Sequence, residues 1–404
     1  MYENSFRWFF AITLFTNSAL WMQRVNQDWI ALDISKSAIV LGVVTSLQFL
    51  PAFILSLQGG KIADRNNKAK VLVISNLSFS GIAVVSGFLI QNNRFTIELL
   101  LIVTTLFGLV SAVDGPVRLA YVTELNGAER IARGIGLNSL SFNFGRFVGP
   151  IIAGSIAALF GVHAIQYLVG FVYLCTAILV WALRPVNYDF DTMQVRPEQV
   201  TVAEGVSRLR EQAETKLVIL YVFAVSLLSM HFPTYIAIMA RLEFDLPIDK
   251  FSYVFSSIAL GFGIGGILIS RVQGRMSVAR IFRSTQLFTF CAIVTGLAPT
   301  PTTFSLSLIS TGIFGMLMVG SLNAYVQEAS PDKFNGRFVG IYISVFTAGT
   351  TIGVLFVGLG AELINPRFPM IAGPCLTLLI GWWILTRTRL LKGLDSCQGT
   401  TDSK

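Results

Sequence analysis

The sequence AYVTELNGAERIAR, from Ala120 to Arg133, returns in altered form as AYVQEASPDKFNGR, from Ala324 to Arg337. Chance is the alternative explanation, because small residues such as glycine and alanine are common in membrane helices. A shared Glu and a shared Arg on one diagonal argue against chance, and so do three glycines at the same offset of 204 positions. We therefore predict two related halves, whose matched glycines are Gly145, Gly149 and Gly154 in the first and Gly349, Gly353 and Gly358 in the second.

Apolar runs fill both halves at regular intervals. A membrane helix with its connection takes about 30–35 residues, so this chain has room for roughly twelve. A membrane β-barrel would need short alternating strands and long polar loops, and the sequence shows neither pattern. The runs lie at about residues 6–30, 38–60, 71–91, 97–122, 134–158, 163–183, 217–240, 251–269, 281–298, 303–327, 338–361 and 369–387.

The predicted fold is an all-α membrane protein, with twelve transmembrane helices in two pseudo-symmetric six-helix bundles. The expected division is a first bundle at 1–184, a cytoplasmic central loop at 185–216, a second bundle at 217–391 and a cytoplasmic tail at 392–404. Within the loop, VAEGVSRLREQ has helical spacing and is expected to lie along the membrane surface. The tail has the composition of a disordered segment.

Composition excludes several classes of protein. Of the 404 residues, 53% are hydrophobic and only 13% are charged, whereas soluble proteins carry about 25% charged residues. Acids and histidines are too scattered for a hydrolase site, and the four cysteines have no paired spacing that predicts a disulfide or a zinc site. A nucleotide-binding GxxxxGK[ST] loop is also missing. We expect no enzyme activity, catalytic residue, metal, cofactor or ATP.

Lys and Arg set the predicted orientation. With the N-terminus inside, 22 of them fall in cytoplasmic segments and five in outer loops, which matches the excess of positive charge on cytoplasmic loops of membrane proteins. The net charge of +8 therefore predicts orientation rather than nucleic-acid binding. Both termini are expected in the cytoplasm. The first apolar run continues too long for a cleaved signal peptide and is read as a span.

The loop after the second apolar run carries a charged motif. In GGKIADRNNKAKVL, Gly60, Asp64, Arg65 and Lys68 have the spacing GxxxDRxxK. Gly60 would let two helices approach closely, and Asp64 could accept hydrogen bonds from the N-terminus of a neighbouring helix. The simpler alternative is a positively charged cytoplasmic loop with no further role.

This motif resembles the signature of the major facilitator superfamily. The family's usual glycine after DRx is Asn67 here, and the second-half copy has Ser270 in place of Asp64. In that family the loop latches the two halves in the outward-open state, so the resemblance implies a gating role for Gly60, Asp64, Arg65 and Lys68. The missing acid predicts a weaker latch in the second half.

The fifth run contains GRFVGPIIAG, in which Gly145, Gly149, Pro150 and Gly154 form a small-residue face with a kink. GxxxGPxxAG is similar to the motif of proton-coupled antiporters in the superfamily, which is associated with export. Ordinary tight helix packing is the alternative. Longer stretches, including NQDWIALDIS and LNSLSFNFGRFVGP, resemble the exporter subfamily that includes the enterobactin exporter and macrolide-efflux proteins.

Charges inside membrane helices are costly, and they are the best independent clue to function. Arg24 and Asp28 lie one turn apart in the first run, as do Asp114 and Arg118 in the fourth, so each couple could pair on one helix face. Asp114, Arg118 and Asp28 are the candidates for proton coupling, through competition between a proton and an arginine for a carboxylate. Arg24 and Asp28 could instead be interfacial, and Arg118 could be structural.

Four polar residues are candidates to contact a substrate: Arg24, Asn138, Arg146 and His231. Arg146 lies about 14 residues into its run, roughly 21 Å from the inner end at 1.5 Å per residue. It could bind an anionic substrate group, neutralise Asp114 or be purely structural. His231, followed by Pro233, could sit at a helix break, either as a satisfied buried histidine or as a proton relay.

Two parallel halves place a substrate path between them, which is the architecture of a secondary transporter. The predicted function is proton-driven export of bulky amphiphilic small molecules, such as drugs or siderophores, by alternating access. The alternatives are a nutrient uptake symporter of the same fold and a membrane protein that does not transport. The expected location is the bacterial plasma (inner) membrane, and the expected partners are a small-molecule substrate, protons and lipid, for a monomeric protein.

Overall fold

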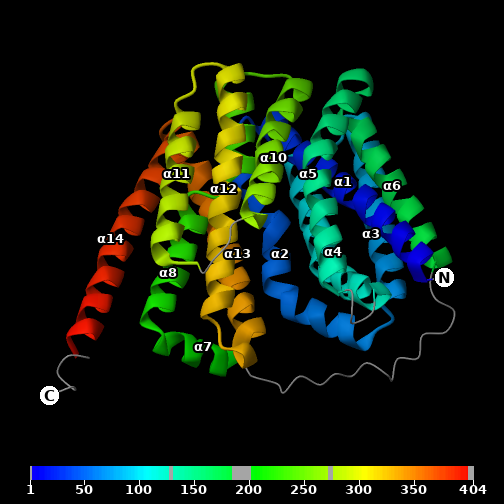
Figure 1. The fold of residues 1–404 in the computed structure, drawn as a ribbon. Coiled ribbons are helices and arrows are strands. Elements are labelled where there is room, and N and C mark those ends of the chain that lie inside the picture. The colour runs from blue at the N-terminus through cyan, green and yellow to red at the C-terminus, as the bar shows by residue number, and fades with distance from the viewer. Residues whose placement is uncertain (1, 127–130, 184–201, 272–275, 399–404) are drawn as a thin grey trace. The chain divides into compact units, whose positions relative to one another are not determined.

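A computed structural model describes residues 2–126, 131–183, 202–271 and 276–398. Every regular element within these ranges is a helix (Figure 1). The elements are α1 Tyr2–Ser35, α2 Ala38–Arg65, α3 Lys68–Gln91, α4 Ile97–Asn126, α5 Ile131–Phe160, α6 Val162–Leu183, α7 Val202–Glu211, α8 Ala213–Leu228, α9 Phe232–Ile238, η2 Met239–Glu243, α10 Ile248–Ser270, α11 Val278–Gly296, α12 Pro301–Ala329, η3 Asp332–Phe334, α13 Asn335–Leu363 and α14 Phe368–Gln398.

All twelve predicted runs fall in helices, and the run at 217–240 is divided among α8, α9 and the π-helix η2. Among the described residues, ten helical spans are long and apolar enough to cross a membrane. Neither α1 nor α11 belongs to these ten. The reason is polarity, because α1 carries Arg24, Asp28 and Asp33 and α11 begins with two arginines. The structure thus confirms an all-helical chain with many spans, while the number twelve stays a prediction.

Each of three short turns between helices contains one residue with a left-handed backbone. Lys36 has φ 55° between α1 and α2, Asn93 has φ 53° between α3 and α4, and Gly161 has φ 85° between α5 and α6. Side-chain caps start the following helices where polar residues precede them. Ser37 accepts from the backbone N–H of Val40 at the start of α2.

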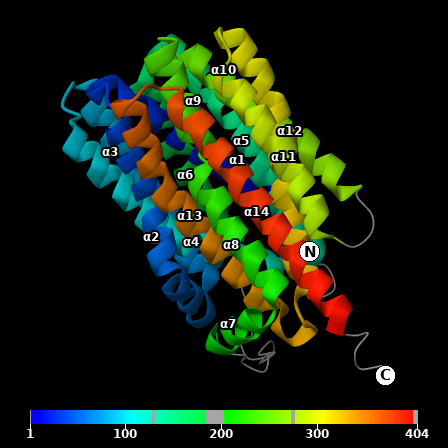
Figure 2. The ribbon, with the colours of Figure 1, turned by 90° about the vertical axis from the view of Figure 1, so that its left-hand side faces the viewer.

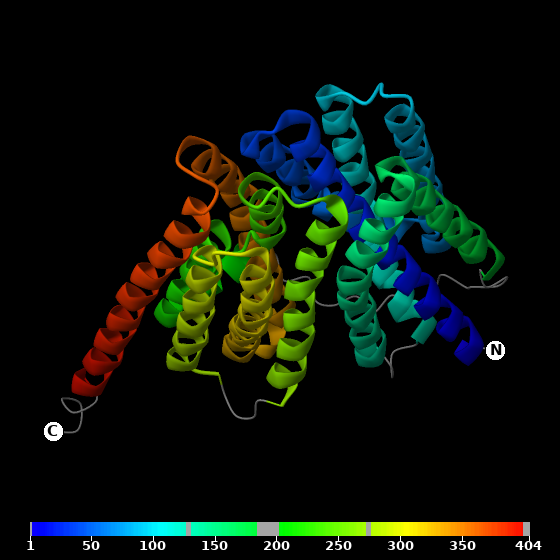
Figure 3. The same cartoon turned by 90° about the horizontal axis from the view of Figure 1, so that it is seen from above.

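Two compact units make up the chain. Unit 1 contains residues 1–192, 233–259 and 354–366, and unit 2 contains 193–232, 260–353 and 367–404. In unit 1, α1 packs along α5, α2 along α4, and α3 along α6 (Figures 1 and 3). In unit 2, α14 packs along α8 and α11 (Figure 2), and α11 also packs along α12.

Aromatic rings form part of the core of unit 1. The ring of Phe79 on α3 stacks on Phe107 of α4 and on Tyr173 of α6, with ring centroids 5.3 and 4.7 Å apart. Large apolar side chains also cover the surface, and Leu159, Phe171 and Trp382 are each more than half exposed. Apolar exposure on this scale is unfavourable in water, so it indicates a lipid-facing surface.

Two segments, the central loop and the C-terminal tail, contain more helix than the sequence predicts. The predicted surface helix exists as α7, although α8 begins directly after it at Ala213. The predicted disordered tail is helical at its start, because α14 continues to Gln398. Charged residues near the end of α14 do not interrupt a helix that consists of good helix formers such as leucine, lysine and arginine. Most of the predicted central loop, at 184–201, lies outside the described residues.

Candidate functional site

Asp114 and Arg118 form a buried ion pair on α4. Two parallel hydrogen bonds, both 2.9 Å long, join Nε and Nη2 of Arg118 to the two carboxylate oxygens of Asp114. Both residues are buried, and Pro116 lies between them in the helix. The pairing predicted from the spacing of one turn is therefore confirmed. The two parallel bonds of a bidentate pair fix the orientation of the guanidinium group relative to the carboxylate.

Arg118 also reaches two neighbouring helices in unit 1. Its Nη1 donates to the Thr16 hydroxyl on α1 at 3.2 Å, and its Nη2 donates to the Asn76 side-chain oxygen on α3 at 3.5 Å. Thr16 in turn donates to the Ile12 carbonyl. The ion pair thus ties α4 to α1 and α3, and loss of the Asp114 charge would loosen a junction of three helices. Thr16 and Asn76 were not predicted as part of the site.

Arg24 and Asp28 do not form the ion pair that their spacing allows, although both are described and lie on one face of α1. Arg24 lies over the rings of Trp21 and Phe49, with its guanidinium carbon 5.1 and 4.8 Å from the two centroids. Asp28 is 1% exposed and accepts from the Gln48 amide on α2 at 3.2 Å. The Asp28 carboxylate therefore lies inside the protein, while its depth in the membrane stays a prediction.

Arg146 on α5 approaches the same tryptophan. Its guanidinium carbon is 4.8 Å from the Trp21 ring and 5.1 Å from the Phe142 ring. We call Arg24 and Arg146 the arginine pair. Trp21 was not predicted as a site residue, although its place three residues before Arg24 puts it on the same helix face. Asn138 lies half-buried two turns before Arg146 on the same helix.

His231 lies at a helix break, as predicted, between the end of α8 and the start of α9. The side chain is 3% exposed, and its Nε2 is 2.8 Å from the Leu227 carbonyl oxygen. This contact favours the interpretation as a satisfied buried histidine over that of a proton relay. His231 belongs to unit 2, whereas the arginine pair belongs to unit 1.

The glycines of the fifth-run motif lie at close helix contacts. A Cβ atom added at Gly145 would be 2.6 Å from the Asn17 carbonyl carbon, and one at Gly149 would be 2.7 Å from the Ser18 carbonyl oxygen. Both contacts join α5 to α1. Pro150 follows Gly149 inside α5, and a Cβ at Gly154 would meet Ser252 of α10 at 2.6 Å. The motif therefore packs helices tightly, whatever its relation to export.

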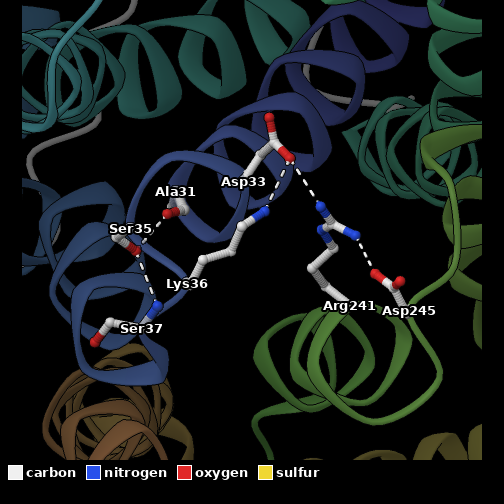
Figure 4. Close-up of polar contacts among 7 residues, drawn as sticks. All are labelled: Ala31, Asp33, Ser35, Lys36, Ser37, Arg241 and Asp245. Atoms are coloured by element: carbon white, nitrogen blue, oxygen red, sulfur yellow. Dashed lines mark hydrogen bonds and ion pairs between the residues drawn. The ribbon is translucent and has the colours of Figure 1, made fainter.

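A second charged cluster joins α1 to the π-helix η2 in unit 1 (Figure 4). Arg241 donates to Asp33 at 3.0 Å and also pairs with Asp245. Lys36 reaches the same carboxylate oxygen of Asp33 at 3.4 Å from one turn further along the chain. Figure 4 shows both cations pointing toward Asp33. The sequence does not predict this cluster, because its members lie in or next to short turns.

Comparison with known proteins identifies the family. A family model of major facilitator transporters, described as "Transmembrane secretion effector", matches residues 1–401. The chain belongs to the major facilitator superfamily. The predicted resemblance is thereby confirmed, and the members of this superfamily are transporters and not enzymes.

Several known members of the superfamily are similar to the chain over most of its length. It is 21% identical to the staphyloferrin A transporter of Staphylococcus aureus over 97% of this chain and 99% of the relative. It is 23% identical to the enterobactin exporter EntS of Shigella boydii, over 80% and 77% of the two chains. A crystal structure of a bacterial homologue of the human lysosomal transporter Spinster matches with a TM-score of 0.78, at 14% identity, over 97% and 98% of the chains. The last likeness shows the fold alone.

The signature loop of this major facilitator member lies at the junction of α2 and α3. Arg65 is exposed as the last residue of α2, and Lys68 begins α3. Asn67, which stands where the family has glycine, caps α3 by accepting from the backbone N–H of Lys70 at 3.0 Å. Asparagine is a good helix N-cap, which explains the departure. The surroundings of Gly60 and the side chain of Asp64 are outside what the structure describes, so the latch stays a prediction.

Proposed function

We propose that this chain is a proton-driven exporter of bulky amphiphilic small molecules, in the drug and siderophore range. The buried ion pair of Asp114 and Arg118 is the observation that carries the proposal. A protonated Asp114 no longer offers a charge to Arg118, whose other bonds reach α1 and α3. Proton uptake would therefore change the packing of three helices, which is what coupling of a proton to alternating access requires.

One curated relative supports the direction of transport, because it is named an exporter of enterobactin. Another is named a transporter of staphyloferrin A, which supports a siderophore as the substrate. We further propose that the chain is a multi-pass protein of the bacterial plasma membrane. In this proposal it has twelve helices in two six-helix bundles, and both termini lie in the cytoplasm. The excess of Lys and Arg in the predicted inner segments supports that orientation.

The proposal is tested by efflux from a bacterial strain that lacks its own exporters. Enterobactin, staphyloferrin A and ethidium are loaded in turn, and their loss from the cells is compared with and without the protein. Export of at least one compound, driven by a pH gradient in proteoliposomes, is the expected result. Accumulation in right-side-out vesicles would instead identify an uptake symporter.

Alternating access also assigns a role to the charged cluster of Asp33, Lys36, Arg241 and Asp245, which we call the Asp33 cluster. With the N-terminus inside, the α1–α2 turn and the turn after η2 both face outward, so we place the Asp33–Arg241 contact at the outer side. Further contacts in unit 1 join α2 to α9 and to α13: the Thr234 hydroxyl donates to Thr45 at 3.4 Å, and the Ala38 backbone N–H donates to the Glu362 carboxylate at 2.6 Å. These contacts would have to open when substrate leaves outward.

Removal of the Asp33 charge should favour opening of this outer side. For Asp33→Asn we expect alkylation of Thr45→Cys, in a background without other cysteines, to accelerate by up to about fivefold, because a partly exposed ion pair contributes up to about 1 kcal/mol. Lys36→Gln is the matched control, since Lys36 and Asp33 belong to one helix end and do not join two segments. Equal acceleration in the control would contradict the assignment.

A further inference from the structure

Positive charge gathers around one buried tryptophan on α1. The guanidinium groups of Arg24, from α1, and Arg146, from α5, both lie within about 5 Å of the Trp21 ring centroid, at 5.1 and 4.8 Å. Trp21 itself is 4% exposed. Two like charges held against the same ring repel each other, and the repulsion grows as water is excluded. A negative charge bound next to the two guanidinium groups would offset this repulsion, so the arrangement favours binding of an anion.

The protein does not neutralise Arg24 as it neutralises Arg118. Among the described residues, no carboxylate lies within ion-pair distance of Arg24. Asp28, the acid one turn further along α1, is instead held by the Gln48 amide. The contrast with the bidentate bonds between Asp114 and Arg118 shows that α1 keeps a cation without a contacting counter-charge in a membrane helix, which is costly unless it serves a purpose.

Trp21 adds a further donor. Its indole Nε1 is buried and has no hydrogen-bond partner among the described residues. An indole N–H can only donate, and so can a guanidinium group. The group that satisfies Trp21 must therefore be an acceptor, and the neighbouring arginine pair favours an acceptor with negative charge.

Aromatic rings surround the same position. Phe142 and Phe255 contact the Trp21 ring with centroids 5.5 and 6.1 Å apart, and Phe49 lies against Arg24 at 4.8 Å. All of these residues belong to unit 1. A bound molecule would meet donors and positive charge next to flat apolar surfaces. This combination suits an acidic group attached to an aromatic or apolar body.

We propose that the arginine pair and the Trp21 N–H bind the acidic group of the transported compound, and that the substrates are amphiphilic organic anions. The inference rests on the proposed function, because it takes the bound anion to be the exported molecule. It narrows the substrate class from amphiphilic compounds in general to those that carry an acidic group.

The test compares two probes of similar shape and opposite charge. The full chain is placed in lipid nanodiscs, and binding of 1-pyrenebutyrate and of 1-pyrenemethylammonium is measured by fluorescence anisotropy. The wild type should bind the anion at least about tenfold more tightly than the cation. Arg24→Gln and Arg146→Gln should each weaken anion binding by about tenfold, the effect of one lost charge-assisted hydrogen bond, and should not weaken cation binding.

Arg387→Gln provides the matched control. Arg387 also lies over a tryptophan, with its guanidinium carbon 5.7 Å from the Trp383 ring on α14 in unit 2, and its loss should not alter binding of either probe. If an arginine variant does not fold, Trp21→Phe keeps an aromatic ring and removes the indole N–H together with the second ring. This variant should weaken anion binding by a smaller factor of about three.

Equal binding of the two probes by the wild type would overturn the inference. Anion binding by both glutamine variants at the wild-type level would do so as well, since the arginines would then only pack the helices. Failure of the proposed function looks different. Tight binding of pyrenebutyrate without its efflux from cells would refute export, whereas export of ethidium without anion binding would refute the substrate class alone.

Discussion

Asp114→Asn is expected to reduce proton-driven efflux to the level of cells without the protein. The amide cannot take up or release a proton in place of the carboxylate, so the proposed coupling step is lost. The variant also leaves Arg118 as a buried cation without its counter-charge, and breaking a buried pair in this way costs about 3–5 kcal/mol. Flux in proteoliposomes under an imposed pH gradient is the measurement, with binding of 1-pyrenebutyrate as a check that the site survives.

Two further variants separate coupling from stability. Asp114→Glu keeps a titratable group and should retain part of the flux. The double variant Asp114→Asn with Arg118→Gln removes both charges, so it should recover much of the lost stability in thermal unfolding and still fail to couple. Proton-driven flux by the double variant at the wild-type level would show that the ion pair only holds the helices together.

The sequence predicts the helices well because each long apolar run can adopt only one stable backbone conformation in a membrane. A backbone in lipid must satisfy its own hydrogen bonds, so a long apolar segment becomes a helix. The predicted run at 217–240 is the exception. It is divided between Leu228 and Phe232, because Pro233 has no backbone N–H and therefore fits the first turn of α9 but not the interior of one continuous helix. The run then continues through η2.

The two predicted ion pairs show how far spacing can be trusted. Asp114 and Arg118 pair as expected, while Arg24 and Asp28, at the same spacing, do not. The acid precedes the base in the first couple and follows it in the second, and the first order is the more favourable on a helix. Spacing shows only which residues of one helix can reach each other. The competing partner of Asp28, Gln48, comes from another helix, and the sequence does not show how the two helices are aligned.

The glycine motif illustrates a further limit. Resemblance associates it with export, yet the structure shows the same close contacts at the matched positions of the second half. A Cβ at Gly349 would collide with Ser226, and one at Gly353 would collide with Leu227 and His231, all within unit 2. Gly145 and Gly149 meet the first helix of their six-run half, and Gly349 and Gly353 meet the first helix of theirs, so close packing is sufficient to explain these four glycines.

Gly149→Ala is therefore expected to destabilise the protein by about 1–3 kcal/mol, the range for an overpacked contact, and Gly149→Val by more. The added Cβ would lie 2.7 Å from the Ser18 carbonyl oxygen and 3.0 Å from the Trp21 Cβ. Neither atom belongs to the flexible end of a side chain, so α1 as a whole must move. Thermal unfolding in nanodiscs measures the loss.

Gly81→Ala on α3 is the matched control, because nothing lies within 4 Å of the Cβ it would add. It should stabilise the helix by up to about 1 kcal/mol. A displaced α1 would also carry Trp21 away from Arg146, so Gly149→Ala should weaken anion binding together with stability. If the variant were as stable as the wild type and bound the anion normally, but no longer exported, the glycine would act in export itself and the packing explanation would be wrong.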